Sequence, residues 1–167
     1  MAIYHLSSQI IKRSMGRSSV AAAAYRAGQK LLDERTGLVH DYRAKTGCDH
    51  QLILAPEHAP DWVFERAQLW NRVEQKEKRK DAQLCREIDI ALPVELTQAQ
   101  MIALVTQYAQ SAFIELGMIA DIAFHHLDSH NPHCHIMLTM RDLIGADLGA
   151  KNRQWNDKAL LVQWRSN

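Results

Sequence analysis

Five of the nine histidines in this 167-residue chain lie between positions 125 and 135, at a spacing that suits metal binding. His133 and His135 are two residues apart in a segment with strand character, so both rings should project from one face, about 7 Å apart. A third ligand is expected from the preceding strand, where His125 and His126 compete. We favour His125 and hold His126 in reserve, because the even-numbered positions of that strand are otherwise apolar and should face the core.

Three histidine ligands around a divalent cation would leave open coordination positions and the full double charge available to polarise a phosphate. All-imidazole ligation suits manganese, cobalt, nickel or zinc. The same residues also fit a structural zinc site or a hairpin that carries surface histidines. Glu87 and Asp89 share the polar face of an expected strand over 84–92. If that strand neighbours the hairpin, one carboxylate can accept the outer N–H of a ligand imidazole.

Among the four tyrosines, Tyr25 is the candidate nucleophile. It follows four alanines and precedes Arg26, so its small neighbours would let a substrate strand come close. A tyrosyl oxygen can attack phosphorus and hold the product as a covalent ester, which divides a transesterification into two steps. The residues alone also fit a tyrosine that packs on a helix.

The formal charge of +1 is unevenly distributed along the chain. Residues 1–47 carry eight basic and three acidic side chains, residues 48–140 carry seven and thirteen, and residues 141–167 carry five and three. Basic ends around an acidic middle indicate an anionic partner, with phosphate the obvious candidate, or else an ordinary charge-mixed surface.

Composition argues against several classes of protein. A hydrophobic content of 47% with 23% charged residues is typical of a folded domain rather than a disordered chain. No stretch approaches 18 apolar residues without a charge, so no membrane segment is expected. Three widely spaced cysteines do not suggest a disulfide framework and, with no secretory signal at the N-terminus, favour a cytoplasmic protein.

Hydrophobic periodicity and capping residues predict alternating strands and helices. Segments 119–127 and 133–140 should form an antiparallel hairpin, so the fold class is α+β, a sheet with one face under helices and the other face open. The last helix has no stop signal, which suggests the front part of a longer protein. The expected strands are 2–7, 37–42, 51–54, 84–92, 119–127 and 133–140; the expected helices are 18–32, one from Pro60, one from the capping box of Thr97 and Gln100 to Gly117, and 155–165; residues 8–17 are expected to form a loop.

Four stretches in this order resemble the MobA/MobL family of plasmid mobilisation relaxases, within the wider class of His-hydrophobe-His nucleases: AIYHLS, GRSSVAAAAYRAGQKL, REIDIALPVELT and FHHLDSHNPHCHIMLTMRD. The residue between the paired histidines is the small Cys134, a departure that is tolerable because it should face the core. The resemblance implies a single relaxase domain over residues 1–167, the N-terminal part of a longer protein. It also implies a central antiparallel sheet of about five strands, helices on one face, and an open face for the metal and single-stranded DNA.

The resemblance implies a reaction as well. Such relaxases cut one DNA strand at the nic site of a plasmid origin of transfer, and the family uses magnesium or manganese. Tyr25 matches the nucleophile, which would become linked to the 5′ phosphate and free a 3′ hydroxyl, so that the strand can be rejoined later. Glu87 matches the acidic catalytic position on the central strand, where it would either orient a histidine or help to deprotonate the tyrosine. The histidines that match the metal ligands are His125, His133 and His135.

The expected partners are single-stranded DNA at the nic site, accessory relaxosome proteins and a coupling protein. The alternatives are a rolling-circle replication initiator, a metal-dependent phosphodiesterase that uses water, and a non-catalytic DNA-binding module with a structural metal. The basic residues expected to contact DNA are Lys12, Arg13, Arg17, Arg26, Lys151 and Arg153.

Overall fold

The structure is a computed structural model that describes residues 5–166, so the expected strand positions Ala2 and Tyr4 lie outside the described residues. The elements, in chain order, are β1 (His5–Lys12), α1 (Ser19–Ala27), β2 (Lys30–Asp33), β3 (Leu38–Asp41), β4 (Cys48–Leu54), α2 (Arg66–Lys76), β5 (Gln83–Ala91), α3 (Gln98–Ala112), β6 (Ala120–His125), β7 (His133–Leu138), β8 (Arg141–Ile144), β9 (Asp147–Lys151) and α4 (Lys158–Ser166).

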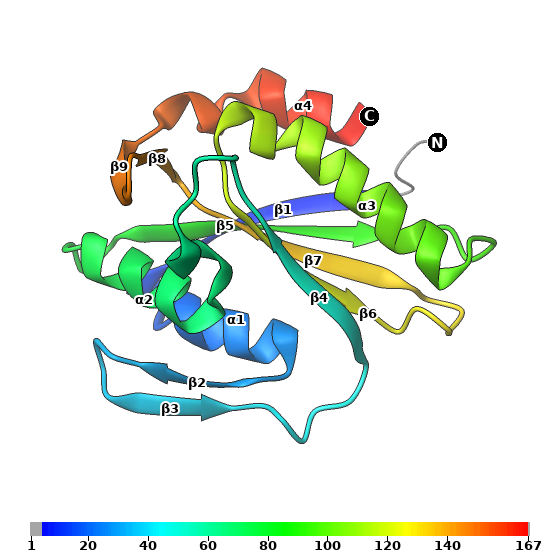
Figure 1. The fold of residues 1–167 in the computed structure, drawn as a ribbon, viewed down its shortest axis with the longest axis horizontal. Coiled ribbons are helices and arrows are strands. Elements are labelled where there is room, and N and C mark those ends of the chain that lie inside the picture. Colours follow the sequence, from blue (N-terminus) through cyan, green and yellow to red (C-terminus); the bar gives the residue numbers. More distant parts are fainter. Residues whose placement is uncertain (1–4, 167) are drawn as a thin grey trace.

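A five-stranded antiparallel sheet in the order β1-β5-β7-β6-β4 forms the centre of the fold (Figure 1). Two further hairpins, β2–β3 and β8–β9, stand apart from it. The α+β class and the central antiparallel sheet are confirmed, including the predicted β6–β7 hairpin. In that hairpin His125 pairs with His133, which puts both side chains on the same face of the sheet.

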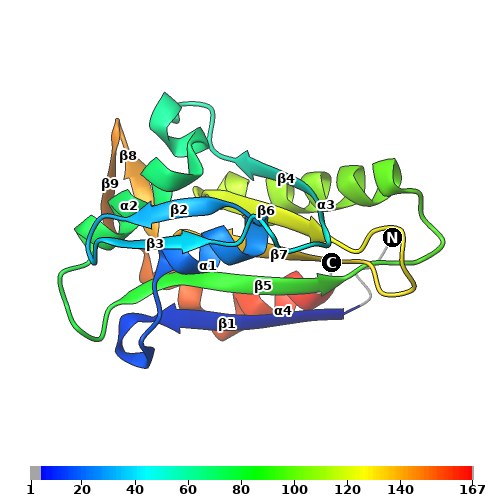
Figure 2. The same cartoon turned by 90° about the horizontal axis from the view of Figure 1, so that it is seen from below.

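Helices lie on both faces of this sheet, and the two faces have separate apolar cores (Figures 1 and 2). On one face Ile88 and Phe124 pack against α3 and α4, as expected for the helix-covered face. On the other face α1 and α2 cover Ile11 and Met137. This second face is not uniformly polar: its apolar end requires helical cover, and only its other end carries the histidines. The open region is therefore smaller than the sequence suggested.

Helix α1 owes its limits to two capping residues. The Ser18 hydroxyl accepts a hydrogen bond from the Ala21 N–H at 3.2 Å, the expected N-cap interaction. Gly28 ends the helix with a φ of +65°, and its N–H donates to the Ala24 carbonyl. The helix is therefore shorter than the predicted 18–32, and the chain turns back into the β2–β3 hairpin beside it.

Other boundaries also differ from the prediction, among them those of β1, α2 and α4. The prediction of a loop over 8–17 is wrong for its first half, because β1 continues to Lys12 as an edge strand whose polar side chains face solvent. A short 3-10 helix, Asp61–Phe64, follows Pro60 before α2 begins. The capping box of Thr97 is present, whereas the final helix begins only at Lys158.

A buried carboxylate joins α1 to α2. Glu74 on α2 is 1% exposed, and its Oε2 accepts hydrogen bonds from the backbone N–H and the hydroxyl of Ser19, at 2.8 and 2.7 Å. The Arg13 guanidinium donates to the other oxygen at 2.8 Å. The start of the helix that carries Tyr25 is thus tied to α2 by charge-assisted hydrogen bonds.

Glu74→Ala should destabilise the fold by about 3 kcal/mol, because it leaves the Arg13 charge and the Ser19 N–H without their buried partner. Chemical denaturation monitored by circular dichroism measures this change. Gln75→Ala, an exposed neighbour on the same helix, should cost less than about 0.5 kcal/mol. Equal losses from both substitutions would contradict the role assigned to Glu74.

Candidate metal centre and nucleophile

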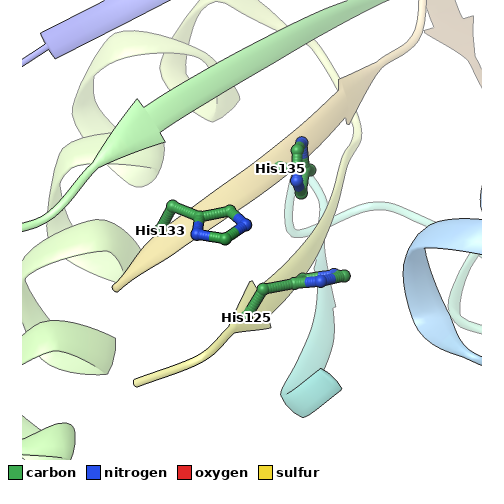
Figure 3. A group of neighbouring side chains, drawn as sticks. All are labelled: His125, His133 and His135. Carbon is green, nitrogen blue, oxygen red and sulfur yellow. The ribbon is translucent and has the colours of Figure 1, made fainter. Parts of the chain in front are cut away.

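The structure brings three of the predicted ligands together on one face of β6 and β7 (Figure 3). One ligand atom each from His125, His133 and His135 lies within 4.8 Å of the others. The ring centroids form a triangle with sides of 5.5 Å (His125–His133), 4.9 Å (His125–His135) and 5.2 Å (His133–His135). Three imidazoles this close can share one cation.

Each of the three rings has one nitrogen engaged with an oxygen. His135 Nδ1 meets the Asp89 carboxylate, and His133 Nδ1 lies 2.9 Å from the Asn131 carbonyl. His125 Nε2 lies 2.8 Å from the Arg26 carbonyl. Because a carbonyl or carboxylate only accepts, these nitrogens carry the protons, and the opposite nitrogen of each ring keeps a lone pair for a metal. The donor set therefore fits a divalent cation.

Burial and charge set the protonation of these groups. Burial lowers the pKa of His125 to about 4, so this ring is neutral near pH 7, as a ligand must be. Burial acts to lower the pKa of His135, but its hydrogen bonds to Asp89 and Glu87 raise it above the ordinary value. Burial acts to raise the pKa of Asp89, but the hydrogen bond and charge of His135, together with the Arg26 charge, lower it below the ordinary value. A cation therefore competes with a proton at His135 when the pH falls.

Glu87 connects this site to α1. Its side chain is buried, its Oε1 forms an ion pair with the Arg26 guanidinium, and His135 Nδ1 lies 3.5 Å from the same oxygen. Its other oxygen, Oε2, is buried with no hydrogen-bond partner among the described residues. Glu87 and Asp89 lie on the same face of β5, and Asp89 pairs with His135 across the sheet. Both carboxylates therefore lie beside the same imidazole, as expected for neighbouring strands.

Tyr25 lies at the end of α1 that meets this site. The next residue, Arg26, contacts the site twice, through its carbonyl to His125 and through its guanidinium to Glu87. Tyr25 is 42% exposed, so it is not a tyrosine buried in the core. Its ring packs edge-on against Tyr42 at a centroid distance of 5.2 Å. An accessible phenol thus lies at the end of the helix that contacts the histidine cluster.

A model of the MobA/MobL family matches residues 17–167. The chain belongs to the MobA/MobL family. It is 51% identical over 125 residues to the mobilization protein MobL of Acidithiobacillus ferridurans, covering 75% of this chain and 32% of that protein. It is 43% identical over 163 residues to the conjugal transfer protein TraA of Agrobacterium fabrum, covering 90% of this chain and 14% of that protein. The chain thus spans a third or less of these two relatives.

The solved structures include a close match in fold, reported as "Molecular Basis of Vancomycin Resistance Transfer in Staphylococcus aureus". It superposes with a TM-score of 0.91 at 33% identity, covering 98% of this chain and 87% of that chain. The five-stranded sheet and its helices are therefore shared with that protein. Among the described residues of this MobA/MobL chain, no helix is long and apolar enough to cross a membrane.

His126, the reserve ligand, lies beside the cluster but outside it. Its backbone has a φ of +54°, and its ring centroid lies 6.3 Å from that of His125 and 5.6 Å from that of His133. It is not in the group of atoms close enough to share a cation. Its ring instead packs over Gly47, where an added Cβ would come within 2.5 Å of it. The structure thus places His125 in the cluster and His126 against the β3–β4 connection.

The six predicted DNA-binding residues divide into two groups. Arg17 and Arg26 lie with Tyr25 along one hollow beside α1. Lys12 and Lys151 contact the Gln83 end of β5, six residues and about 20 Å from Asp89. Arg153 lies near that distant end as well. Arg13 belongs to both groups, because its backbone N–H donates to the Ala82 carbonyl and the residue also lines the hollow beside α1.

Besides Arg26, which is paired with Glu87, two more of the six predicted DNA-binding side chains are already engaged by the protein. Arg13 is nearly buried, and its guanidinium donates to the backbone of Glu77 and Arg79 as well as to Glu74. Lys151 donates to the Gln83 carbonyl and forms an ion pair with Glu77 at 3.1 Å. As placed, both support the fold rather than project toward a ligand, so we do not include them in the proposed DNA contacts.

Sequence reasoning missed Lys45. Its Nζ lies 3.7 Å from the centre of the Tyr25 ring and donates to the Tyr25 carbonyl at 3.1 Å. Burial lowers the pKa of Lys45, with a smaller contribution from the Arg26 charge. Only the β2–β3 hairpin brings Lys45 back to α1, and no spacing in the sequence indicates that return. This cation holds the Tyr25 ring in place.

Asp89→Asn should weaken metal binding about 10- to 100-fold, because the amide no longer holds the His135 proton on Nδ1 as a carboxylate does. Isothermal titration with manganese measures the change. Asp128→Asn, an exposed carboxylate in the nearby β6–β7 turn, is the matched control for lost charge and should leave affinity within about twofold. Equal effects would point to general electrostatics rather than to the Asp89–His135 contact.

Proposed function

We propose that this chain is the DNA-nicking domain of a plasmid mobilisation protein. It would cut one strand at an origin of transfer by tyrosine transesterification and later rejoin it. The observation that carries the proposal is the contact of Arg26 with both His125 and Glu87, which brings the helix end bearing Tyr25 to a three-histidine centre. Membership of the MobA/MobL family and the names of the relatives, mobilization and conjugal transfer proteins, support the same activity.

His125, His133 and His135 would hold a divalent cation, which when bound would polarise the scissile phosphate and offset its charge. Manganese or magnesium is the proposed ion. Zinc, nickel and cobalt also accept three imidazoles. Asp89 would fix the orientation of His135, and the Arg26 carbonyl would fix that of His125.

In the proposed reaction the Tyr25 oxygen attacks phosphorus. A bond forms between that oxygen and phosphorus while the bond from phosphorus to the 3′ oxygen breaks. The proton that the phenol loses is balanced by the proton that the leaving 3′ oxygen gains. The product is a 5′-phosphotyrosyl strand with a free 3′ hydroxyl, and reversal of the same steps reseals the DNA. Lys45 over the ring would stabilise the phenolate, and Glu87 would position Arg26 and His135.

The proposed partner is single-stranded DNA of the nic region. The other proposed partners are accessory relaxosome proteins and a coupling protein. The rival with the same chemistry is a rolling-circle replication initiator, which would form its adduct with a replication origin instead.

Incubating the chain with manganese and a labelled single-stranded oligonucleotide of the transfer origin tests the proposal. A denaturing gel should show a labelled covalent protein–DNA band and a shortened strand. A chelator should abolish both while the thermal melting curve changes little. If chelation unfolds the chain, the metal is structural. Cutting without a covalent band would indicate a phosphodiesterase that uses water.

A further inference from the structure

A hollow of about 450 Å³ is lined by residues of α1 and of the β2–β3 hairpin, and Tyr25 is part of its lining. This volume falls within the range of small-ligand sites, about 300–1,000 Å³. We call it the α1–hairpin pocket; its lining includes Arg17, Ala21, Ala22, Tyr25, Leu38 and His40. None of the three clustered histidines lines this pocket, and Tyr25 and Arg26 are the groups of the proposed reaction that do.

The floor of the pocket is one face of α1. Ser18, Ala21, Ala22, Tyr25 and Arg26 all line it, and their spacing of three and four residues is that of a single helix stripe. The alanines leave this stripe flat for the turn that precedes Tyr25. A flat apolar ligand can lie there directly beside the phenol.

The opposite wall comes from the hairpin. Leu38 lines the pocket although 59% of it is exposed, and His40 lines it with Nε2 buried and without a hydrogen-bond partner among the described residues. A buried polar atom without a partner favours a ligand that supplies one. Asp33, the pocket's acidic residue, is already engaged by the Ser18 hydroxyl at 2.8 Å and by the Arg35 N–H at 3.1 Å.

Arg17 contributes a positive charge to the lining of this pocket. Arg13, Arg26 and Arg35 line the pocket too, but each has a carboxylate partner. In the part of the chain that the structure describes, no hydrogen bond or ion pair engages the guanidinium of the half-buried Arg17. A free guanidinium beside a flat apolar wall suits a phosphate attached to a base.

We propose that the α1–hairpin pocket holds one nucleotide of the cleaved strand, unstacked from its neighbours and directly adjoining the scissile phosphate. Arg17 binds its phosphate, and its base lies between the alanine face of α1 and the wall formed by Leu38 and His40. This inference rests on the proposed nicking function. It assigns the pocket a part in choosing where the strand is cut, because base contacts rather than phosphate contacts read sequence.

The test is a base-removal scan in two proteins. Fluorescein-labelled single-stranded oligonucleotides of the transfer origin each carry one abasic position near the nic site. Their binding is followed by fluorescence anisotropy with chelator present, so that no cutting is needed. In the native chain, one abasic position beside the scissile phosphate should weaken binding about tenfold. Ala21→Leu fills the pocket, so it should bind the intact strand about tenfold more weakly and be indifferent to that abasic position. Ala103→Leu, on the exposed face of α3, should behave like the native chain.

Arg17 provides a second measurement that does not depend on pocket shape. Arg17→Ala should reduce the slope of log Kd against log salt concentration by about 0.7, the value for one phosphate contact on a single strand, and Arg17→Lys should restore it. The inference would be overturned if Ala21→Leu bound the oligonucleotides like the native chain, or if Arg17→Ala left the salt slope unchanged.

The covalent gel assay, run in parallel, separates this inference from the proposed function. A covalent band without any dependence on a single base overturns the pocket alone. Base-dependent binding without a covalent band supports the pocket and overturns the nicking proposal. Absence of binding to any of the oligonucleotides overturns both.

Discussion

Tyr25→Phe should abolish the covalent protein–DNA product and reduce strand cutting by about 10⁴-fold or more, since phenylalanine has no oxygen to attack phosphorus. The ring itself remains, so its contacts with Tyr42 and Lys45 should persist and the fold should be retained. Binding of the origin oligonucleotide should change less than about threefold, because the phenol is expected to act in the chemical step. A denaturing gel and an anisotropy titration on the same preparation measure the two effects.

Tyr42→Phe is the matched control, because it removes a hydroxyl from the ring that packs edge-on against Tyr25. It should keep at least about half of the native cutting. If Tyr42→Phe lost the covalent product and Tyr25→Phe kept it, the nucleophile would be misassigned. If Tyr25→Phe still cut the strand without a covalent band, water would be the nucleophile and the proposed mechanism would be wrong.

The histidine cluster could be predicted because strand geometry depends only on spacing. Two residues separated by one position share a face, and the apolar alternation of β6 identifies which of two adjacent histidines joins them. The predicted neighbourhood of Glu87 and Asp89 followed from the same alternation once β5 paired with β7. These inferences depend on the alternation of side chains within strands, and not on the paths of the loops that connect them.

The connection between Tyr25 and the metal centre could not be predicted in this way. It depends on where α1 ends, and the sequence prediction extended that helix past Gly28, to residue 32. The glycine, in the left-handed region, stops the helix instead and leaves the Arg26 carbonyl for His125. The return of Lys45 to the tyrosine follows from the same turn. The position at which α1 ends therefore determines the geometry of this site as much as the histidines do.

The sequence alone does not separate the basic residues that the fold engages from those that remain free for a ligand. Charge counting treats every arginine and lysine as available, whereas burial of Glu74 and Glu77 recruits Arg13 and Lys151 into ion pairs. A buried carboxylate requires a partner, and the sequence does not reveal which cations serve it. Arg17, the cation left without such a partner beside Tyr25, therefore carries more of the DNA-binding proposal than its place in the sequence indicates.

The adjacent pair His125 and His126 offers a sharp test of the metal centre. His125→Ala should weaken manganese binding by more than about 100-fold and reduce cutting by about 10³-fold at a metal concentration that saturates the native chain, because it removes one of three ligands. His126→Ala removes the same ring one residue later and should keep metal affinity within about threefold. Isothermal titration with manganese and the covalent gel assay measure both variants.

The two variants differ in what else they disturb. His125→Ala also leaves the Arg26 carbonyl without its imidazole donor, so a modest loss of stability should accompany the loss of metal. Melting curves of the metal-free proteins separate that loss from the loss of ligation. If His126→Ala lost the metal and His125→Ala kept it, the pairing register of β6 would have to be shifted by one residue, so that His126 and not His125 faced the cluster. The ring triangle, and with it the placement of Tyr25 beside a cation, would then be wrong.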